Sequence, residues 1–464
     1  MVAEVSTVEL DAGFRGRSIR PGEAGYDEAR AVFNGMVDKR PSLIVQPSGS
    51  TDVVDAVNYA RRAGLPVAVR CGGHSVAGKS ATDGGVLIDL RSLKGVHVDP
   101  VSRTAQCNAG VLWGEFDRET QVFGLATPGG RMTTTGVGGF TLGGGYGWLS
   151  PVHGLTCDNL ISADVVTADG RVVTASEDVN PDLFWGIRGG GGNFGVVTSY
   201  RFQLHPVGPL VRAGLLIYSA DEGEQVVRAW RDYVEQAPEE LVTGLGMLLG
   251  PPEPFVPEHL HGKPVIGIFV LYVGDPDDGE DLVRPLTELG DLQANLVEPM
   301  PYAAFQAMID PFAPAGMLNY WRGTHLTGLE DGTVDAFVRS GRQVPSPLTQ
   351  LILFRHGGAV SRVPDEAMAA SHREAAYMSH PLALWQDPDD TARHLQWVNE
   401  CTEAMEPYLT GGIYLNFEPG DDETKVRAGY SADKFARLVE IKDAWDPENL
   451  FRENLNIRPS GTAA

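Results

Sequence analysis

The glycine-rich stretch at residues 129–147, GGRMTTTGVGGFTLGGGYG, constrains the fold of this chain more than any other feature. Nine of its residues are glycine, which costs conformational entropy in a helix or strand and packs no side chain. A merely flexible loop would carry Ser, Asn and charges, whereas this stretch carries Met132, Phe140 and Leu142. We therefore predict an ordered, buried loop whose bare backbone lies against a flat ligand.

A second glycine cluster surrounds a histidine where a predicted strand ends. The apolar residues 65–69 lead into RCGGHSVAG at residues 70–78, in which His74 follows two glycines and precedes a serine. A backbone this bare lets a large group lie against the imidazole.

The third cluster, RGGGGNFGVVT at residues 188–198, formally contains the G-x-G-x-x-G fingerprint of dinucleotide-binding proteins at Gly190, Gly192 and Gly195. The residues that follow are β-branched and aromatic, so these glycines open a strand. A nicotinamide-binding Rossmann domain needs a helix N-terminus at this place and is disfavoured.

The first part of the chain alternates between strand and helix patterns. Residues 42–47 form a predicted strand, and Ser50 or Thr51 caps a helix that continues to Gly64. The next strand ends at residue 70, so this βαβ unit delivers the chain into the His74 loop.

Further elements follow in the same half of the chain. We expect a strand at 85–90, a hairpin at 95–107 that turns at Asp99-Pro100, and a helix around 112–124. A second hairpin at 163–176 turns at Asp169-Gly170.

From about residue 206 the glycine density falls, and long apolar segments alternate with helical ones. This texture indicates a second domain with an antiparallel sheet covered by helices on one side. The fold class is therefore α+β, with a first domain at 1–205, a second at 206–410, and a C-terminal segment, 411–464, that returns to the first.

Composition and charge exclude several classes of protein and several kinds of site. The chain has 464 residues, is 42% hydrophobic and carries a net charge of −24, which argues against nucleic acid or an anionic membrane as partner. The N-terminus lacks a signal-peptide pattern, so we expect a cytoplasmic protein. Four widely spaced cysteines suggest no disulfide framework, and His259 and His261 form a poor metal site, so no metal is expected.

The order of motifs carries a resemblance. VRCGGHSVAG, LIDL, the glycine-rich stretch, DLFWGIRGGGGNFGVVT and DPENLFRENLNI occur in the order found in FAD-linked oxidases of the vanillyl-alcohol oxidase and berberine-bridge-enzyme family. The resemblance covers residues 25–205 and 405–459 and is strongest to small bacterial members such as 6-hydroxy-D-nicotine oxidase. It implies a two-domain, PCMH-type FAD-binding fold.

The resemblance also implies a covalent cofactor. In this family the histidine of the GGH loop is bonded to the 8α-methyl carbon of FAD, which assigns the anchor to His74. Backbone N–H groups of residues 71–75 would bind the pyrophosphate. Met132 stands where many relatives carry a second, cysteinyl link, and a thioether cannot act as that nucleophile, so we expect one link. Cys71 and Cys157 are expected to be small packing residues.

The cofactor-binding residues implied by the resemblance lie in the three glycine clusters and the C-terminal tail. They are Arg70, Cys71, Gly72, Gly73, His74, Ser75, Gly78, Gly129, Gly130, Met132, Thr135, Gly136, Gly138, Gly139, Leu142, Tyr146, Gly147, Gly192, Val196, Val197, Asn454 and Asn456.

Four residues are the expected catalytic group. Thr135 stands where the family usually has an aliphatic residue beside the reacting dioxygen, and its hydroxyl either holds oxygen or only packs. Tyr146 and Tyr414 match places where relatives put phenols that face the flavin, and either could be the base. Asn416 would bond the polar edge of the flavin or orient the substrate.

We therefore expect an enzyme, an FAD-dependent oxidase that takes hydride from a C–H bond next to O or N of a small molecule and reduces O2 to H2O2. The alternative is a flavin-dependent oxygenase or oxidative cyclase of secondary metabolism that uses a flavin-oxygen adduct positioned by Thr135. A ligand-binding protein that kept the fold is a third interpretation. Substrate identity and oligomeric state, a homodimer included, stay open.

Overall fold

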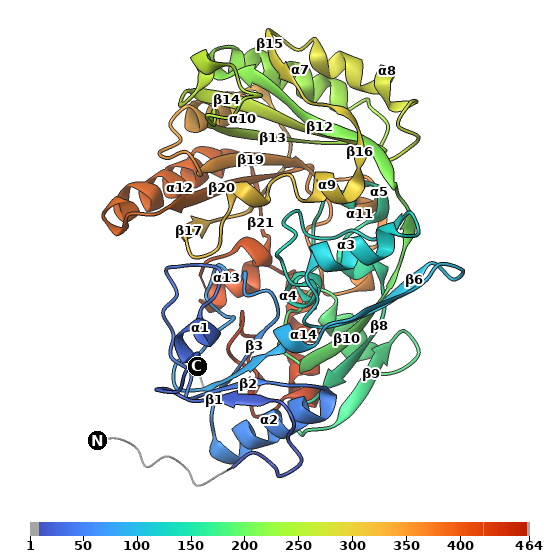
Figure 1. Ribbon diagram of the computed structural model, residues 1–464, viewed down its shortest axis with the longest axis vertical. Helices are drawn as coiled ribbons and strands as arrows, with labels where there is room; N and C mark the ends of the chain where they lie inside the picture. The colour runs from blue at the N-terminus through green and yellow to red at the C-terminus, as the bar shows by residue number, and fades with distance from the viewer. Residues whose placement is uncertain (1–8, 421, 462–464) are drawn as a thin grey trace.

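Three large β-sheets and the helices packed on them make up the chain, which a computed structural model describes for residues 9–420 and 422–461 (Figure 1). Two sheets lie in the lower half of Figure 1 and the third in the upper half. The predicted α+β fold with two domains is confirmed. Of the N-terminus, which the sequence suggested to lack a signal peptide, residues 1–8 lie outside the described residues.

The first sheet positions the His74 loop. Its strands, in spatial order, are β1 (Arg17–Ile19), β2 (Leu43–Gln46), β4 (Val86–Asp89) and β3 (Val67–Arg70). Helix α2 (Ser50–Ala63) connects β2 to β3 as predicted, but β4 lies between these two strands and pairs with both in parallel. The predicted cap is wrong: Gly49 precedes the helix, Ser50 is its first residue, and no side chain caps it.

The second sheet is antiparallel and supports the other glycine clusters. Its spatial order is β5 (Val96–Asp99), β6 (Thr104–Asn108), β10 (Val196–Gln203), β8 (Leu160–Val166) and β9 (Val172–Ser176). Both predicted hairpins are present, and the third glycine cluster leads into strand β10, as expected.

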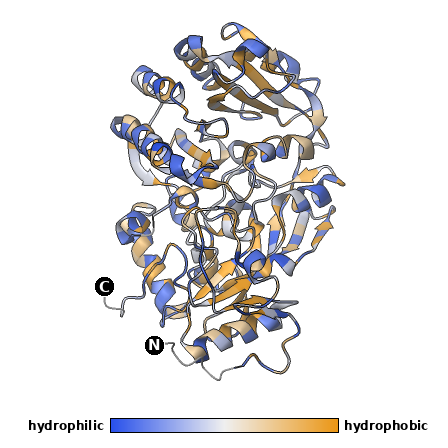
Figure 2. Cartoon of the chain, turned by 60° about the vertical axis from the view of Figure 1, so that its left-hand side comes forward, coloured by the Kyte–Doolittle hydropathy of each residue, from blue (hydrophilic) through white to orange (hydrophobic). Residues whose placement is uncertain are grey.

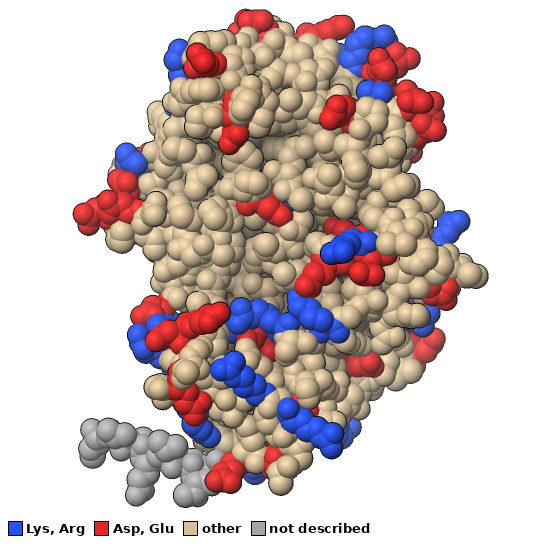
Figure 3. All heavy atoms as spheres, in the orientation of Figure 1, with Lys and Arg blue, Asp and Glu red and all other residues tan. Residues whose placement is uncertain are grey.

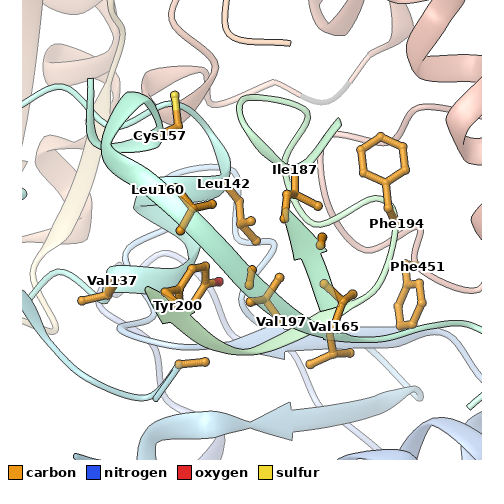
Figure 4. Close-up of a cluster of buried hydrophobic side chains, with 14 of the residues drawn as sticks. Val137, Leu142, Cys157, Leu160, Val165, Ile187, Phe194, Val197, Tyr200 and Phe451 are labelled. Atoms are coloured by element: carbon orange, nitrogen blue, oxygen red, sulfur yellow. The ribbon is translucent and has the colours of Figure 1, made fainter. Parts of the chain in front are cut away.

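The helices of this half are α1 (Tyr26–Arg30), α3 (Trp113–Gln121), α4 (Val137–Leu142), α5 (Ser150–His153) and α6 (Pro181–Ile187). Helix α1 packs on the first sheet, whereas α3 and α6 contact the second. Figure 4 shows the apolar core between them and the sheet, with Leu142, Ile187 and Val197 among its members. Helix α4 lies inside the stretch that we predicted to be a loop throughout, because a single short turn of helix is stabilised here by burial rather than by propensity.

The third sheet belongs to the second half of the chain and is antiparallel. Eight strands follow in spatial order, with two more pairing at its sides: β15 (Leu292–Asn295), β12 (Leu210–Ser219), β14 (Pro264–Tyr272), β13 (Leu241–Leu249), β19 (Gln350–Arg355), β20 (Tyr377–Trp385), β18 (Thr324–Leu326), β21 (Leu409–Ile413), β16 (Glu298–Pro301) against β12, and β17 (Leu318–Trp321) against β20. Its main covering helices are α7 (Gly223–Val234), α10 (Asp331–Gly341) and α12 (Thr391–Met405).

The two faces of this sheet have different roles. Successive side chains of a strand point to opposite faces, and on β19 Leu351 and Leu353 enter the helix-covered core, while Ile352 and Phe354 face the first half of the molecule. The outer faces of the helices are largely hydrophilic in Figure 2, in contrast to the sheets. The sheet therefore forms a roof over the glycine clusters.

The C-terminal segment returns to the first domain. Helix α14 (Ala432–Trp445) packs on α6, and the buried Lys442 ammonium pairs with Asp446 at 2.6 Å. Lys442 also donates to the carbonyl of Asn193, whose side chain donates to the Leu455 carbonyl at 3.1 Å. These bonds hold the asparagine-rich tail against the third glycine cluster.

The surface carries charges of both signs. Acidic and basic side chains are interspersed over the face in Figure 3, so the net charge of −24 forms no single patch there. Among the described residues, no helix is both long and apolar enough to cross a membrane.

A buried ion pair ties the end of β3 to β4. Arg70 Nη2 lies 2.7 Å from Asp89 Oδ2, and these side chains are 1% and 0% exposed. Arg91, 41% exposed, pairs with the same carboxylate at 2.9 Å. Burial raises the pKa of Asp89, but hydrogen bonds from Arg91 and Arg70 outweigh this effect and lower it to about 2.

Arg70→Met should lower the free energy of unfolding by about 3 kcal/mol, because it leaves a buried carboxylate short of a partner. Arg91→Met, the matched control at the surface, should cost less than about 1 kcal/mol. Because the folded pKa of Asp89 is depressed, the Arg70 contribution is present above pH of about 4 and is lost as the pH falls towards 2. Urea unfolding across this range measures both effects; equal losses in the two variants would contradict the assignment.

Candidate functional site

A cavity of about 340 Å³ lies between the glycine clusters and the large sheet. Its floor comes from the His74 loop, the 129–147 stretch and the third glycine cluster, and its roof from β17, β19 and β20. The C-terminal tail closes one side. All three clusters that the sequence singled out therefore meet at one site.

Most of the predicted site residues line this cavity. They are Cys71, Gly72, Gly73, His74, Ser75, Gly130, Met132, Thr135, Gly136, Gly138, Gly139, Leu142, Tyr146, Gly192, Val196, Val197, Asn416 and Asn454. Those absent from its lining are Arg70, Gly78, Gly129, Gly147, Tyr414 and Asn456.

The residues outside the lining have structural surroundings that explain their identity. Arg70 is committed to Asp89, and Gly78 has a positive φ of 68° in a turn. Gly129 and Gly147 contact each other, since a methyl group on Gly147 would lie 1.8 Å from the Gly129 carbonyl oxygen. These contacts support the loops, and the expected cofactor contacts of these four residues stay a prediction.

Gly72 and Gly136 mark the crossing of the His74 loop and the 129–147 stretch. A methyl group on Gly72 would lie 2.2 Å from the Gly136 amide nitrogen, and one on Gly136 would lie equally close to that of Gly72. Packing between the loops therefore requires these glycines. At Gly139 and Gly192, in contrast, a methyl group would meet nothing within 4 Å, which leaves their backbone open to a ligand.

The His74 loop presents a row of free donors. Within the described residues, the backbone N–H groups of residues 73–77 donate no hydrogen bond, whereas Gly78 N–H closes the turn onto the Ser75 carbonyl at 3.1 Å. Consecutive free N–H groups form a concavity suited to an anion, and the loop lines the cavity.

His74 itself is held between two loops. Its ring stacks on Phe33 with 4.0 Å between ring centres, and its Nε2 lies 3.1 Å from the Thr134 hydroxyl oxygen. Burial lowers the pKa of His74 to about 4, against a small opposing effect of the Thr134 backbone. The imidazole is therefore neutral at pH 7 and can act as a nucleophile.

Burial keeps the cysteine thiols near the site protonated. Burial raises the pKa of Cys71 to about 11 and raises that of Cys157 as well, so both are thiols at neutral pH. Cys71 Sγ accepts from the Gly138 N–H at 3.4 Å and sits in the cavity wall. Met132 packs beside Phe33 and Trp321.

The hydroxyl groups of Thr135, Tyr146 and Tyr414 differ in the hydrogen bonds that they make within the protein. Thr135 lines the cavity, and in the described chain its hydroxyl makes no hydrogen bond. The Tyr146 hydroxyl donates to the Arg355 carbonyl. The Tyr414 hydroxyl accepts from the Tyr146 N–H at 3.0 Å and from Asn416 Nδ2 at 3.1 Å.

Tyr414 faces a separate, smaller cavity of about 30 Å³ behind the loop, together with His325, His356 and His372. His325 Nδ1 and both ring nitrogens of His356 are buried without partners, so this space suits an ordered water. Burial raises the pKa of Tyr146 and of Tyr414 to about 12. The Tyr414 hydroxyl thus contacts Tyr146 and Asn416, two residues that line the main cavity, and its catalytic role stays a prediction.

His380 is a site residue that the sequence did not reveal, because MSHPLALW contains no motif around it. It lies on β20, lines the cavity and stacks on Phe417 with 4.0 Å between ring centres. Its Nδ1 lies 2.7 Å from the Arg322 carbonyl oxygen, so Nδ1 carries the proton and Nε2 has a free lone pair. Burial lowers the pKa of His380 to about 3, which keeps the ring neutral.

Arg131, in the glycine-rich stretch, also lines the cavity and was not predicted. The four cysteines are free. Among the residues described, no group of three or more His, Cys, Asp or Glu is placed to hold a metal ion.

Two known protein families match segments of the chain that line this site. A family described as "FAD binding domain" matches residues 41–176, and one described as "Berberine and berberine like" matches residues 413–458. The large sheet between them lies outside both matches.

Whole-chain relatives cover nearly the entire sequence. An FAD-linked oxidoreductase of Dictyostelium discoideum is 30% identical over 97% of this chain and 96% of its own length, and (R)-6-hydroxynicotine oxidase of Paenarthrobacter nicotinovorans is 30% identical over 98% and 100%. The crystal structure of 6-hydroxy-D-nicotine oxidase from Arthrobacter nicotinovorans superposes with a TM-score of 0.88 at 28% identity, covering 98% of this chain and 100% of that one.

Proposed function

Because this chain belongs to the vanillyl-alcohol-oxidase and berberine-bridge-like family of FAD-linked oxidoreductases, we propose that it is an oxidase acting on a small organic substrate. The substrate would lose a hydride from a C–H bond next to oxygen or nitrogen, and dioxygen would leave as hydrogen peroxide. One observation carries the proposal: the neutral His74, the free donors of residues 73–77, the Thr135 hydroxyl and the free nitrogen of His380 line the same cavity.

The residues present fit FAD. The free N–H groups of residues 73–77 suit an anionic pyrophosphate, and the open backbone at Gly139 and Gly192 suits a flat ring system. The buried Oδ1 of Asn454 lacks a donor in the described chain, which a polar cofactor edge would supply. When bound, FAD supplies a hydride acceptor that returns its electrons to dioxygen.

His74 is the proposed covalent anchor, through a bond from a ring nitrogen to the 8α carbon of FAD. The neutral imidazole has a nucleophilic lone pair, and Phe33 and Thr134 restrict the ring to one orientation. A single link is supported by Met132 and by the protonated thiols of Cys71 and Cys157.

His380 is the proposed base, in place of the two tyrosines. Its free Nε2 can accept a proton from a substrate O–H or N–H as the hydride departs. The Tyr146 hydroxyl is bound to the Arg355 carbonyl, and Tyr414 lies behind the loop. The tyrosines then shape the cavity and position Asn416.

Thr135 supports a second candidate function, an oxygenase or oxidative cyclase. Its hydroxyl has no partner within the described chain, and it lines the cavity from which oxygen must react. A free hydroxyl there can hold dioxygen by a hydrogen bond.

His74→Ala should release FAD on acid precipitation, whereas the wild-type pellet stays yellow, because only a covalent bond survives denaturation. Absorbance of the pellet and supernatant measures this, and a peptide map locates the flavin. A colourless wild-type pellet, or flavin on Cys71, would refute the single histidyl link.

His380→Asn should slow anaerobic flavin reduction by about 10²- to 10⁴-fold and leave substrate binding nearly unchanged. A panel of alcohols and amines, screened by peroxide release, supplies the substrate for stopped-flow measurement. Since His380, with its pKa of about 3, is already deprotonated, the wild-type rate should be flat between about pH 5 and pH 9. A rate that rises with pH, and falls in Tyr414→Phe, would instead assign the base to Tyr414, whose pKa is about 12.

Thr135→Val keeps the shape of the side chain and removes its hydroxyl. If that hydroxyl holds oxygen, reoxidation by O2 should slow while anaerobic reduction stays within about 2-fold of wild type. An oxidase should release one peroxide per turnover, whereas an oxygenase should place label from ¹⁸O2 in its product. Unchanged reoxidation in the valine variant would leave Thr135 with a packing role only.

A further inference from the structure

Arg131 brings a positive charge into the cavity wall without a carboxylate partner. Its guanidinium carbon lies 3.4 Å from the centre of the Phe354 ring, 4.7 Å from that of Tyr146 and 4.9 Å from that of Trp148. Among the described residues, no Asp or Glu forms an ion pair with Arg131, and its Nε is buried without an acceptor.

The carboxylates that line the same cavity are already paired. Glu418 lies 3.1 Å from the ammonium of Lys425, and Glu453 lies 3.6 Å from that of Lys39. Neither of them is paired with Arg131, so the charge of its guanidinium is left uncompensated.

An uncompensated guanidinium in such surroundings is costly. Aromatic faces attract a cation, and the Tyr146 hydroxyl oxygen also interacts with the guanidinium, but these groups are neutral and supply no negative charge to compensate it. Burial lowers the pKa of Arg131 to about 10, with Tyr146 and Tyr414 opposing the shift, so the group stays charged at neutral pH. A half-buried cation in the cavity wall without an anionic partner points to a ligand that supplies the opposite charge.

The surroundings also describe the rest of that ligand. Phe354, Trp321 and Phe417 give the cavity flat apolar walls. The charge of Arg131 contributes to the low pKa of His380, so both groups act on the same region. An arginine fork binds a carboxylate through two parallel hydrogen bonds, which would fix the orientation of a flat molecule against the base.

We propose that Arg131 binds the carboxylate of the substrate, so that this enzyme acts on an organic acid whose apolar part packs on the aromatic walls. The inference rests on the proposed function, because it assigns the cavity to the substrate. We infer this substrate class from Arg131 and the aromatic walls, and not from the activities of the relatives.

Calorimetric titration of the holoenzyme tests the assignment without turnover. The probes are benzoate, phenylacetate and 3-phenylpropanoate, each compared with its neutral amide. In the wild type at least one acid should bind about 10- to 100-fold more tightly than its amide. Arg131→Met should abolish that preference while the affinity for the amide changes less than about 2-fold, and Arg131→Lys should retain part of it.

Arg437→Met is the matched control, because its guanidinium also stacks on an aromatic ring, that of Trp185 at 4.1 Å, but lies outside the cavity lining. This variant should keep the wild-type preference. Equal binding of acids and amides by the wild type, no binding of any acid, or an unchanged preference in Arg131→Met would overturn the proposal. Loss of FAD from Arg131→Met that Arg131→Lys restores would also overturn it, by assigning the charge to the cofactor.

The titration separates this inference from the proposed function. A protein that binds the acids through Arg131 but neither reduces its flavin nor releases peroxide would refute the oxidase and keep the carboxylate site. An active oxidase that binds acids and amides alike would refute the carboxylate site alone.

Discussion

The direct contact between two backbones, at Gly72 and Gly136, is the constraint on which the rest of this site depends. Because a methyl group on either residue would lie 2.2 Å from the amide nitrogen of the other, no other residue type allows the loops to approach so closely. Their crossing sets His74 beside Thr134 and places Thr135 in the same cavity wall. A larger residue at either position would separate the proposed anchor, His74, from Thr135, the residue proposed to handle oxygen.

The remaining walls depend on elements that come from far along the chain. Asn193 and Lys442 fasten the C-terminal tail to the third glycine cluster, which brings Asn454 to the cavity. Alternation along β19 sends Leu351 and Leu353 to the helices and leaves the opposite face of the strand as roof. One sheet thus stabilises its own domain with one face and shapes a site with the other.

The polar groups of the cavity divide into those already satisfied and those left for ligands. The hydroxyls of Tyr146 and Tyr414 are engaged by the protein itself, and neither opens freely into the main cavity. The hydroxyl of Thr135 and the Nε2 of His380 lack such partners in the described chain, and the Arg131 guanidinium has no anionic partner there and an Nε without an acceptor. We therefore propose that these three groups, and not the tyrosine hydroxyls, contact the substrate and dioxygen.

The sequence by itself determined the α+β class, the two hairpins, the three glycine clusters and the family, because local patterns and ordered motifs encode these directly. It also placed His74, Thr135 and most of the lining residues. Only the tertiary structure decided that Arg70 supports the loop, that Tyr414 lies behind it, and that His380 and Arg131 face the cavity. The physical reason is that burial and hydrogen-bond partners arise between segments hundreds of residues apart, and no local pattern records which side chains remain unpaired when those segments meet.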